Sequence, residues 1–325
     1  MKLHIQKYFF VLFLLLSMQA LAMPSVKVTL KVIDENGVPI ESAKAVVNFA
    51  VGTDGNTESE ITDSDGLAIL SGSSTRFIEY GAVKDGYYIS WFEKSYQEVT
   101  GFTGFRRWQP WDETLIVKLK EIIKPRPLYI GDHRPGSPYN IIKMPGINKE
   151  YSYDLIAGDW VVPYGQGTHR DFVFKIDNNK KGLITGRNEY DYSFSLTFSN
   201  EGDGIQTYDA LPVYGSHLRL PHEAPESEYQ SELKQRESSI ATKYIHNDFP
   251  ESRNYFFRIR TVMDDKGNIK SALYGKIHGN IRFSPDYITM LYYLNPDEND
   301  LNLESDYKKN IFPRKRGYGY TEYPP

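Results

Sequence analysis

Short apolar runs separated by Asp-Gly and Asn-Gly turns are the feature that most constrains the fold of this chain. Residues 26–33 (VKVTLKVI) alternate apolar and polar side chains, as a strand with one buried face does. The turn DENG follows at 34–37, and similar turns end at Gly66, Gly86 and Gly267. The 25 tyrosines and 17 phenylalanines favour strands over helices. The pattern predicts an all-β protein.

The first 22 residues have the three parts of a secretion signal. Lys2 and Lys7 form a positive segment, residues 8–16 (YFFVLFLLL) are apolar, and Ala20-Leu21-Ala22 is a small-x-small cleavage site. The apolar stretch is shorter than the roughly 20 residues that span a bilayer. We therefore expect a signal peptide at 1–22 and an exported mature chain without a transmembrane segment.

Cysteine is absent, which bears on the compartment and on how the fold is held together. A bacterial lipoprotein needs a cysteine at its cleavage site, and small secreted domains often depend on disulfides. Neither is possible in a chain with no cysteine. A bacterial periplasm or the exterior of the cell is the expected location.

The charge balance excludes one class of partner. The formal net charge is −4, which provides no global field to attract nucleic acid. The one basic run, Arg314-Lys315-Arg316, lies in the expected C-terminal tail at 313–325 and is most simply a solvated end.

Two domains are expected, at 23–122 and 123–312, because a Pro-rich linker (KPRP) stands at 124–127. Strands in the first are predicted at residues 26–33, 43–49, 67–70, 78–83, 87–89 and 114–119. This spacing of short strands and turns is typical of a β-sandwich.

The first domain also carries a motif. The order V-x-V-x-D-x-x-G-x-P-I-x-x-A-x-V, then T-D-x-D-G, then V-K-D-G-Y-Y resembles the carboxypeptidase regulatory-like domain, which is transthyretin-like and Ig-like. The residues that carry it are Asp34, Gly37, Pro39, Ile40, Ala43, Thr62, Asp63, Gly66, Lys84, Gly86 and Tyr87. The resemblance implies a non-catalytic accessory sandwich. Asp63 and Asp65 begin like a calcium loop but lack its later ligands, and a tight turn explains them better.

The second domain continues the β pattern and should be a larger β-sandwich or jelly roll. Strands are predicted at residues 159–164, 171–176, 192–198, 255–263, 271–281 and 288–294. Residues 226–239 (ESEYQSELKQRESS) are polar and could form a helix, a long loop or an extended edge. The phrases at 158–165, 198–206 and 274–279 resemble bacterial exported proteins of no established activity, which implies no reaction.

An aromatic segment at 91–111 is the candidate binding site. It contains Trp91, Trp108 and Trp111, three of the 4 tryptophans, with Arg106 and Arg107 between them. Aromatic faces beside hydrogen-bond donors suit sugar rings or a partner protein. We single out Trp108, Trp111, Arg106 and Arg107 as ligand-binding residues. The alternative is that these rings pack between the two domains.

No catalytic, cofactor or metal motif is apparent. The histidines outside the signal form no His-Glu-x-x-His, and there is no Gly-x-Ser-x-Gly, thiol or dinucleotide motif. The histidines in question are His133, His169, His217, His222, His246 and His278. His169 with Asp171, or His217 with His222, could converge on Asp203 in space. A carboxylate pair could also be assembled from Asp159, Glu201 and Asp203.

The sequence therefore favours an exported, non-enzymatic binding or structural protein that recognises an envelope glycan or a protein partner. The competing hypothesis is a secreted hydrolase with its site in the second domain. A polar cleft that gathers Asp203, His169 and His278 would favour the hydrolase.

Overall fold

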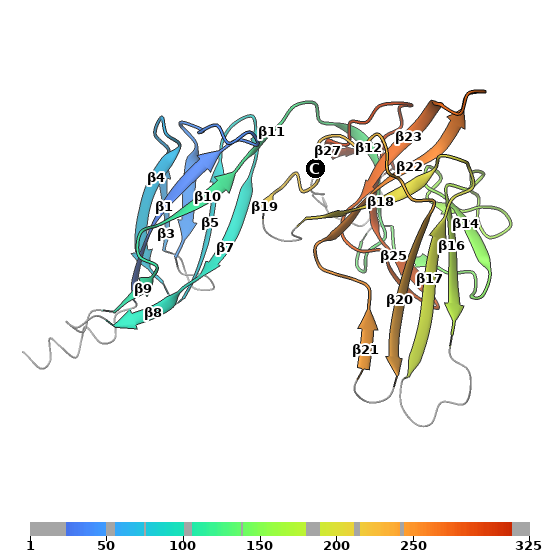
Figure 1. Ribbon diagram of the computed structural model, residues 1–325, viewed down its shortest axis with the longest axis horizontal. Helices are drawn as coiled ribbons and strands as arrows, with labels where there is room; N and C mark the ends of the chain where they lie inside the picture. Colours follow the sequence, from blue (N-terminus) through green and yellow to red (C-terminus); the bar gives the residue numbers. More distant parts are fainter. Residues whose placement is uncertain are drawn as a thin grey trace, which may run out of the picture. The chain divides into compact units, whose positions relative to one another are not determined.

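The structure is a computed structural model that describes residues 24–49, 56–74, 76–100, 106–137, 139–179, 189–210, 215–240 and 244–313 (Figure 1). The expected signal peptide at 1–22 and the basic run at 314–316 lie outside these ranges. The described residues form strands and turns and contain no helix, which confirms the all-β prediction. Those ranges accordingly hold no helix with the length and apolarity of a membrane span.

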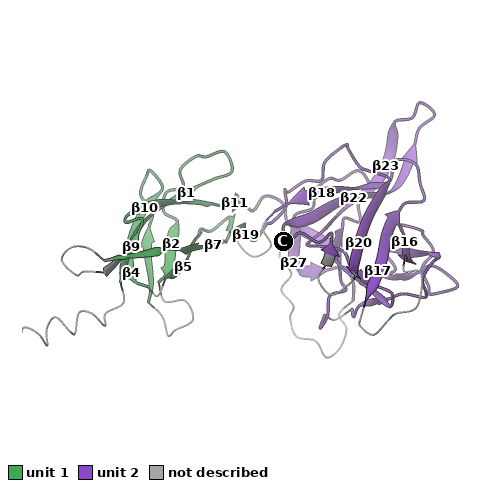
Figure 2. Cartoon of the chain, turned by 60° about the horizontal axis from the view of Figure 1, so that its bottom comes forward, with its two compact units in different colours: residues 1–122, 213–217 green, residues 123–212, 218–325 purple. Residues whose placement is uncertain are grey.

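The chain divides into two compact units (Figure 2). Unit 1 comprises Met1–Ile122 with Val213–His217, and unit 2 comprises Ile123–Pro212 with Leu218–Pro325. The return of the chain to unit 1 is made by β19 (Gly215–Ser216), which pairs with β7 (Ser90–Ser95). Unit 1 therefore takes its last strand from far along the sequence.

Unit 1 is a sandwich of two sheets. In the first sheet β1 (Ser25–Ile33) runs antiparallel to β4 (Leu67–Ser73) and parallel to β10 (Glu113–Lys118). The sheet continues through β9 (Arg106–Gln109) and β8 (Gln97–Thr100). The second sheet has the order β19-β7-β5-β2-β3, where β5, β2 and β3 are Phe77–Val83, Lys44–Asn48 and Thr57–Ile61. The short strands β6 (Tyr87–Tyr88) and β11 (Lys120–Glu121) form a separate pair.

The core of unit 1 is explained by the alternation of apolar and polar residues along its strands. Four apolar residues of β1 are fully buried, whereas Lys27, Thr29 and Lys31 between them are not. Strand residues two apart share a face, so a period of two places one row in the core. The buried row consists of Val26, Val28, Leu30 and Val32.

Three tight turns share the pattern Asp-x-x-Gly and one hydrogen-bond scheme. In each, one carboxylate oxygen of the Asp accepts the backbone N–H groups two and four residues later, at 2.8–2.9 Å. The Gly at the fourth position has positive φ, which a side chain would disfavour. The three aspartates are Asp34, Asp63 and Asp264. Asp63 thus belongs to a turn, as predicted.

Unit 2 contains two six-stranded sheets and one smaller sheet. The first, called the β22 sheet, has the order β18-β22-β23-β26-β12-β27. Its strands are Gly204–Asp209, Arg253–Met263, Ile269–Ile277, Leu291–Leu294, Arg126–Asp132 and Ser305–Asn310. The second, called the β17 sheet, has the order β15-β14-β16-β17-β20-β21. Its strands are Asp159–Trp160, Glu150–Asp154, Phe172–Asn178, Tyr190–Thr197, Glu232–Ile240 and Tyr244–Asn247. The smaller sheet joins β13 (Ile142–Lys143), β25 (Tyr287–Thr289) and β24 (Arg282–Ser284).

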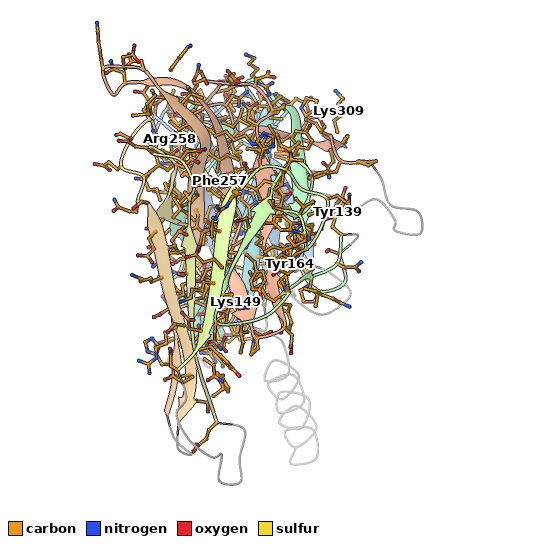
Figure 3. All side chains as sticks on the ribbon, turned by 90° about the vertical axis from the view of Figure 1, so that its right-hand side faces the viewer. Tyr139, Lys149, Tyr164, Phe257, Arg258 and Lys309 are labelled. Atoms are coloured by element: carbon orange, nitrogen blue, oxygen red, sulfur yellow. The ribbon has the colours of Figure 1, made fainter. Side chains whose placement is uncertain are left out.

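The β22 sheet is covered on both of its faces. Phe257, on one face, belongs to the main core and meets Phe172 of β16 at 5.1 Å between ring centroids. The next residue, Arg258, lies on the other face, 4.7 Å from the centre of the Tyr229 ring. Phe257 and Arg258 are both labelled in Figure 3. Two smaller apolar clusters, centred on Phe256 and Tyr293, also occupy that face. Double burial explains why 255–263 (YFFRIRTVM) shows no clean alternation.

Two predictions about the second domain need correction. The strand expected at 159–164 is limited to Asp159–Trp160, because the Asp159 carboxylate accepts the backbone N–H groups of Trp160 and Gln166 and holds a turn. The segment 226–239, for which a helix, a long loop and an extended edge were all open, contributes all but the last residue of β20 (Glu232–Ile240). Since β20 pairs with both β17 and β21, it is not an edge strand.

Arg260 joins the two large sheets of unit 2. It lies in an irregular stretch of β22 and has a φ of 54°. Its guanidinium binds Asp171 at 2.8 and 2.9 Å and Asp154 at 3.0 Å. Asp154 ends β14 and Asp171 precedes β16, and both carboxylates are almost completely buried. Bulges redirect side chains in this way, so the left-handed backbone aims Arg260 across the sandwich.

Replacing Arg260 with Ala should destabilise unit 2 strongly, since two buried carboxylates would lose their shared cation. We expect a loss of about 3–5 kcal/mol in the free energy of unfolding, measured with urea. Arg253→Ala on the same strand is the control, because its partner Asp209 is 62% exposed. That control should cost no more than about 1 kcal/mol. Equal losses in the two variants would contradict the structural role of Arg260.

Candidate functional site

Trp108, at the centre of the predicted ligand site, lies in the core of unit 1. Its side chain is 5% exposed, and its indole N–H donates to the Ser74 carbonyl at 2.7 Å. Trp111 is 39% exposed. The side chains of Arg106 and Arg107 lie outside the described part of the chain. A ring in the core has no free face for a ligand, so a site at this segment would rest on Trp111, Arg106 and Arg107, which stays a prediction.

The neighbouring rings of this segment also pack within unit 1. Trp91 lies on β7 opposite Gly215, and Phe92 stacks on Tyr80 with 5.4 Å between ring centroids. Phe102 and Phe105 lie outside the described residues. Much of the aromatic content that marked this segment is therefore used for packing in its own unit.

Asp203, His169 and His278 do not come together in the described structure, where no hydrogen bond or ion pair joins any two of them. Asp203 accepts the Thr261 N–H at 2.8 Å, and burial raises its pKa despite that bond. The His169 side chain is exposed, whereas His278 is 5% exposed and packs on Tyr293 at 4.6 Å between ring centroids. Asp203 is also buried, so the three side chains differ in exposure, and none of them lines the groove described below.

Asp159, one of the carboxylates considered for catalysis, holds a turn through the backbone N–H groups of Trp160 and Gln166, and the neighbouring Asp154, which the sequence did not single out, also holds turns. Asp154 accepts backbone N–H groups of Ile156, Ala157, Thr168 and His169 besides its bond from Arg260. Burial alone would raise the pKa of Asp154, but the backbone hydrogen bonds and the Arg260 charge lower it to about 2. Such a carboxylate is committed to structure. Among the described residues no three His, Asp or Glu side chains are grouped so as to hold a metal ion.

A groove at one end of β17 is the best candidate site in unit 2. By strand alternation Tyr190, Tyr192, Phe194 and Leu196 share one face of β17. Phe194 and Leu196 are buried in the main core, whereas Tyr190 and Tyr192 are half-buried. Figure 1 shows β17 and β20 side by side as a long ribbon that reaches toward β21. The core-facing row of β17 thus continues beyond the core as a partly open wall.

This open-end groove has a volume of about 810 Å³, within the usual range of roughly 300–1,000 Å³ for small-molecule sites. Its aromatic lining is contributed by Tyr190, Tyr192, Phe249, Phe283 and Tyr287. Its polar lining includes Glu189, Glu237, Arg282, Ser284 and Thr289. Apolar walls with a few polar groups are typical of binding sites for small organic molecules.

Side chains that line the groove are held in place by contacts with one another. The rings of Tyr190 and Tyr192 stack at 6.1 Å between centroids with 17° between their planes. The Tyr190 hydroxyl donates to Glu237 at 3.2 Å, and Glu237 stands opposite Tyr192 in the register of β17 and β20. Burial, and then the Glu237 carboxylate, raise the pKa of Tyr190, so it stays a donor. On the other wall, the Arg282 guanidinium lies 5.6 Å above the Phe249 ring.

Sequence reasoning missed this groove. A signal was present in YDYSF at 190–194, where aromatic residues alternate along a predicted strand. However, alternation alone does not distinguish a ring inside the core from one just past its edge. Arg282 and Glu237 lie far from Tyr190 in sequence, so only the fold brings these residues together.

Comparison with known proteins identifies no family. No family model matches the chain, and no curated protein matches it. Among solved structures, catechol 1,2-dioxygenase from Acinetobacter sp. ADP1 is 13% identical, covers 31% of this chain and has a TM-score of 0.24. 3-Chlorocatechol 1,2-dioxygenase from Rhodococcus opacus 1CP is 9% identical, covers 31% of this chain and has a TM-score of 0.25.

The chain spans 54% and 61% of the length of these two dioxygenases. BcpA, the major pilin subunit of Bacillus cereus, is 10% identical over 88% of this chain and 97% of its own, with a TM-score of 0.23. Similarities this low carry no functional argument.

Trp108→Ala should destabilise unit 1, because it removes a large buried ring and leaves the Ser74 carbonyl without its donor. We expect the free energy of unfolding to fall by about 3–5 kcal/mol. Trp111→Ala removes a ring that is 39% exposed and should cost less than about 1.5 kcal/mol. Chemical denaturation of each single variant measures both values, and a mild effect of Trp108→Ala would show that its ring is not a core residue.

Basic side chains surround Tyr293 on the face of the β22 sheet that also carries Arg258. The Lys276 ammonium lies 4.9 Å from the centre of that ring, and His278 packs on the same ring. Burial first, and then the charges of Lys276, Arg219 and Arg134, lower the pKa of His278 well below its ordinary value. The imidazole therefore stays neutral in the folded chain.

Acid should weaken unit 2 through His278. The unfolded chain binds a proton at this residue below about pH 6.5, whereas the folded chain does not, so stability is full above that pH and decreases below it. Between pH 7.5 and 5.5 the loss should be about 1.4 kcal/mol smaller in His278→Gln than in the natural chain. Urea unfolding at both pH values measures it, with His246→Gln at an exposed position as the control. An unchanged pH dependence in His278→Gln would refute this account.

Proposed function

We propose that this chain is an exported, non-enzymatic binding protein whose ligand is a glycan held in the open-end groove of unit 2. The observation that carries the proposal is the stacked pair Tyr190 and Tyr192, which lines a groove of about 810 Å³ beside Glu237 and Arg282. Sugar rings present apolar C–H faces and polar edges. Aromatic faces with adjacent hydrogen-bonding groups complement both.

Other parts of the chain support export and an accessory role for unit 1. Residues 1–22 have the pattern of a secretion signal, and the absence of cysteine suits a bacterial periplasm or exterior. The sequence of unit 1 resembles the carboxypeptidase regulatory-like domain. The two sheets of unit 1 around one apolar core agree with an accessory sandwich. We assign unit 1 the accessory role and unit 2 the binding role.

Co-sedimentation with insoluble polysaccharides and peptidoglycan tests the proposal. The natural chain should bind at least one of them, and Tyr192→Ala and Tyr287→Ala should each weaken that binding about tenfold, since each loses a ring face worth roughly 1–1.5 kcal/mol. Tyr164→Ala is the matched control, because this ring, labelled in Figure 3, is 54% exposed and is not among the residues that line the groove.

Unfolding curves of each variant separate lost binding from lost folding. The glycan proposal fails if the natural chain binds none of the polymers. It also fails if the folded groove variants bind as well as Tyr164→Ala does.

One observation favours the second candidate, a glycan hydrolase. Two carboxylates, Glu189 and Glu237, line the same groove, and glycosidases act through a pair of Asp or Glu residues. Release of reducing ends from a polymer that the chain binds, abolished in Glu237→Gln, would support hydrolysis over simple binding.

A further inference from the structure

We propose that the open-end groove is one part of a longer binding site, and that its ligand is an extended glycan chain rather than a single sugar or a disaccharide. The second part is a neighbouring hollow beside β20, called the β20 hollow, where Gln235 offers an acceptor for a sugar hydroxyl. This inference rests on the proposed glycan-binding function and adds the length of the ligand to it.

The β20 hollow lies beside the first half of its strand. β20 spans Glu232–Ile240, whereas β21 pairs with it from Glu237 to Ile240. Residues 233–235 of β20, together with residues 247–250 that follow the pairing, line a hollow of about 640 Å³. This volume is within the usual range of roughly 300–1,000 Å³ for small-molecule sites. A second space for a ligand therefore exists next to the groove.

The groove and the β20 hollow adjoin at Phe249. This ring lines both of them and packs against Arg282 at 5.6 Å and Phe283 at 5.7 Å. On β20, Glu237 lines the groove and Gln235 lines the hollow. Strand residues two apart share a face and lie about 7 Å apart. A glycan of a few sugar units is long enough to contact both residues.

Gln235 provides the reason to expect a ligand in the β20 hollow. Its side chain is 5% exposed, and its Nε2 donates to the Tyr255 hydroxyl at 2.9 Å. Its Oε1 is buried and has no hydrogen-bond partner in the described structure. Buried polar groups are nearly always hydrogen-bonded, because an unsatisfied acceptor lowers stability. A sugar hydroxyl in the hollow would supply the missing donor.

The other polar side chains of the β20 hollow suit a neutral ligand. Each of its three charged side chains lies within 3.0 Å of a complementary side chain outside the hollow. The pairs are Lys234 with Glu232, Asp248 with His246, and Arg253 with Asp209. The remaining polar lining consists of the amides of Gln235 and Asn247. Amides donate and accept hydrogen bonds without a charge, as the hydroxyl groups of a neutral sugar require.

Calorimetry with oligomers of N-acetylglucosamine and of β-1,4-linked glucose, each as the disaccharide and the hexasaccharide, tests the length of the site. We expect the hexasaccharide to bind about tenfold more tightly than the disaccharide. In Gln235→Met, which keeps the length of the side chain but removes the acceptor, this gain should fall to about threefold or less while the disaccharide binds as before. Gln206→Met is the matched control, because its amide oxygen also lacks a partner but Gln206 lines neither the groove nor the hollow.

Hydrogen exchange locates the ligand without a substitution, and it decides the question if Gln235→Met does not fold. The hexasaccharide should protect the backbone amides of residues 247–253 beside the hollow as well as those of residues 282–289 beside the groove. The disaccharide should protect only the second segment. Absence of added protection at residues 247–253 would overturn the extended site.

The outcomes separate this inference from the proposed function. Equal affinities of the disaccharide and the hexasaccharide, or a length gain that survives in Gln235→Met, would show that the β20 hollow holds only water and would leave glycan binding in the groove intact. The same loss of gain in Gln206→Met would make the effect non-local and would also overturn the extended site. A natural chain that binds none of the oligomers and none of the insoluble polymers would overturn both proposals.

Discussion

Unit 2 depends on an electrostatic contact at a point where its backbone is irregular. Arg260, in a left-handed conformation within β22, reaches Asp154 and Asp171 at the ends of two strands of the opposite sheet. Charges this buried are stable only when they are paired and well hydrogen-bonded. Asp154 meets that condition with four backbone donors besides the arginine. The ion pairs of Arg260 thereby join β22 to the end of β14 and the start of β16.

Arg260 joins the two large sheets, and the sequence of β17 then determines where a ligand can bind. Phe194 and Leu196 face the core, and the same row continues into Tyr190 and Tyr192. Tyrosine suits this position because one end of its ring is apolar and its hydroxyl needs a polar partner, which Glu237 supplies. The open-end groove is thus an extension of the core whose rings stay accessible.

The strands with regular or continuous apolar patterns could be read from the sequence in both domains, as β1, β16 and β22 show. Alternation placed β1 and β10 within a residue or two, and the Asp-x-x-Gly turns were identified because their hydrogen bonds are local. Trp108 was singled out as a ligand-binding residue because it lies among aromatic and arginine residues, but its indole N–H donates to the distant Ser74 carbonyl. β20 had no strand signal, since its polar side chains alternate with few apolar ones, and its pairing with β17 and β21 determines its conformation.

The sequence by itself determined the all-β class, the turns at Asp34, Asp63 and Asp264, and the buried row of β1. Each depends on residues that are neighbours along the chain, for which a period of two or a local hydrogen bond is sufficient. The tertiary structure alone decided which aromatic rings are buried, how Arg260 finds two carboxylates, and that Glu237 and Arg282 line one groove with Tyr192. These contacts join residues tens of positions apart, and burial is a property of the packed sheets, which the local pattern of a strand does not contain.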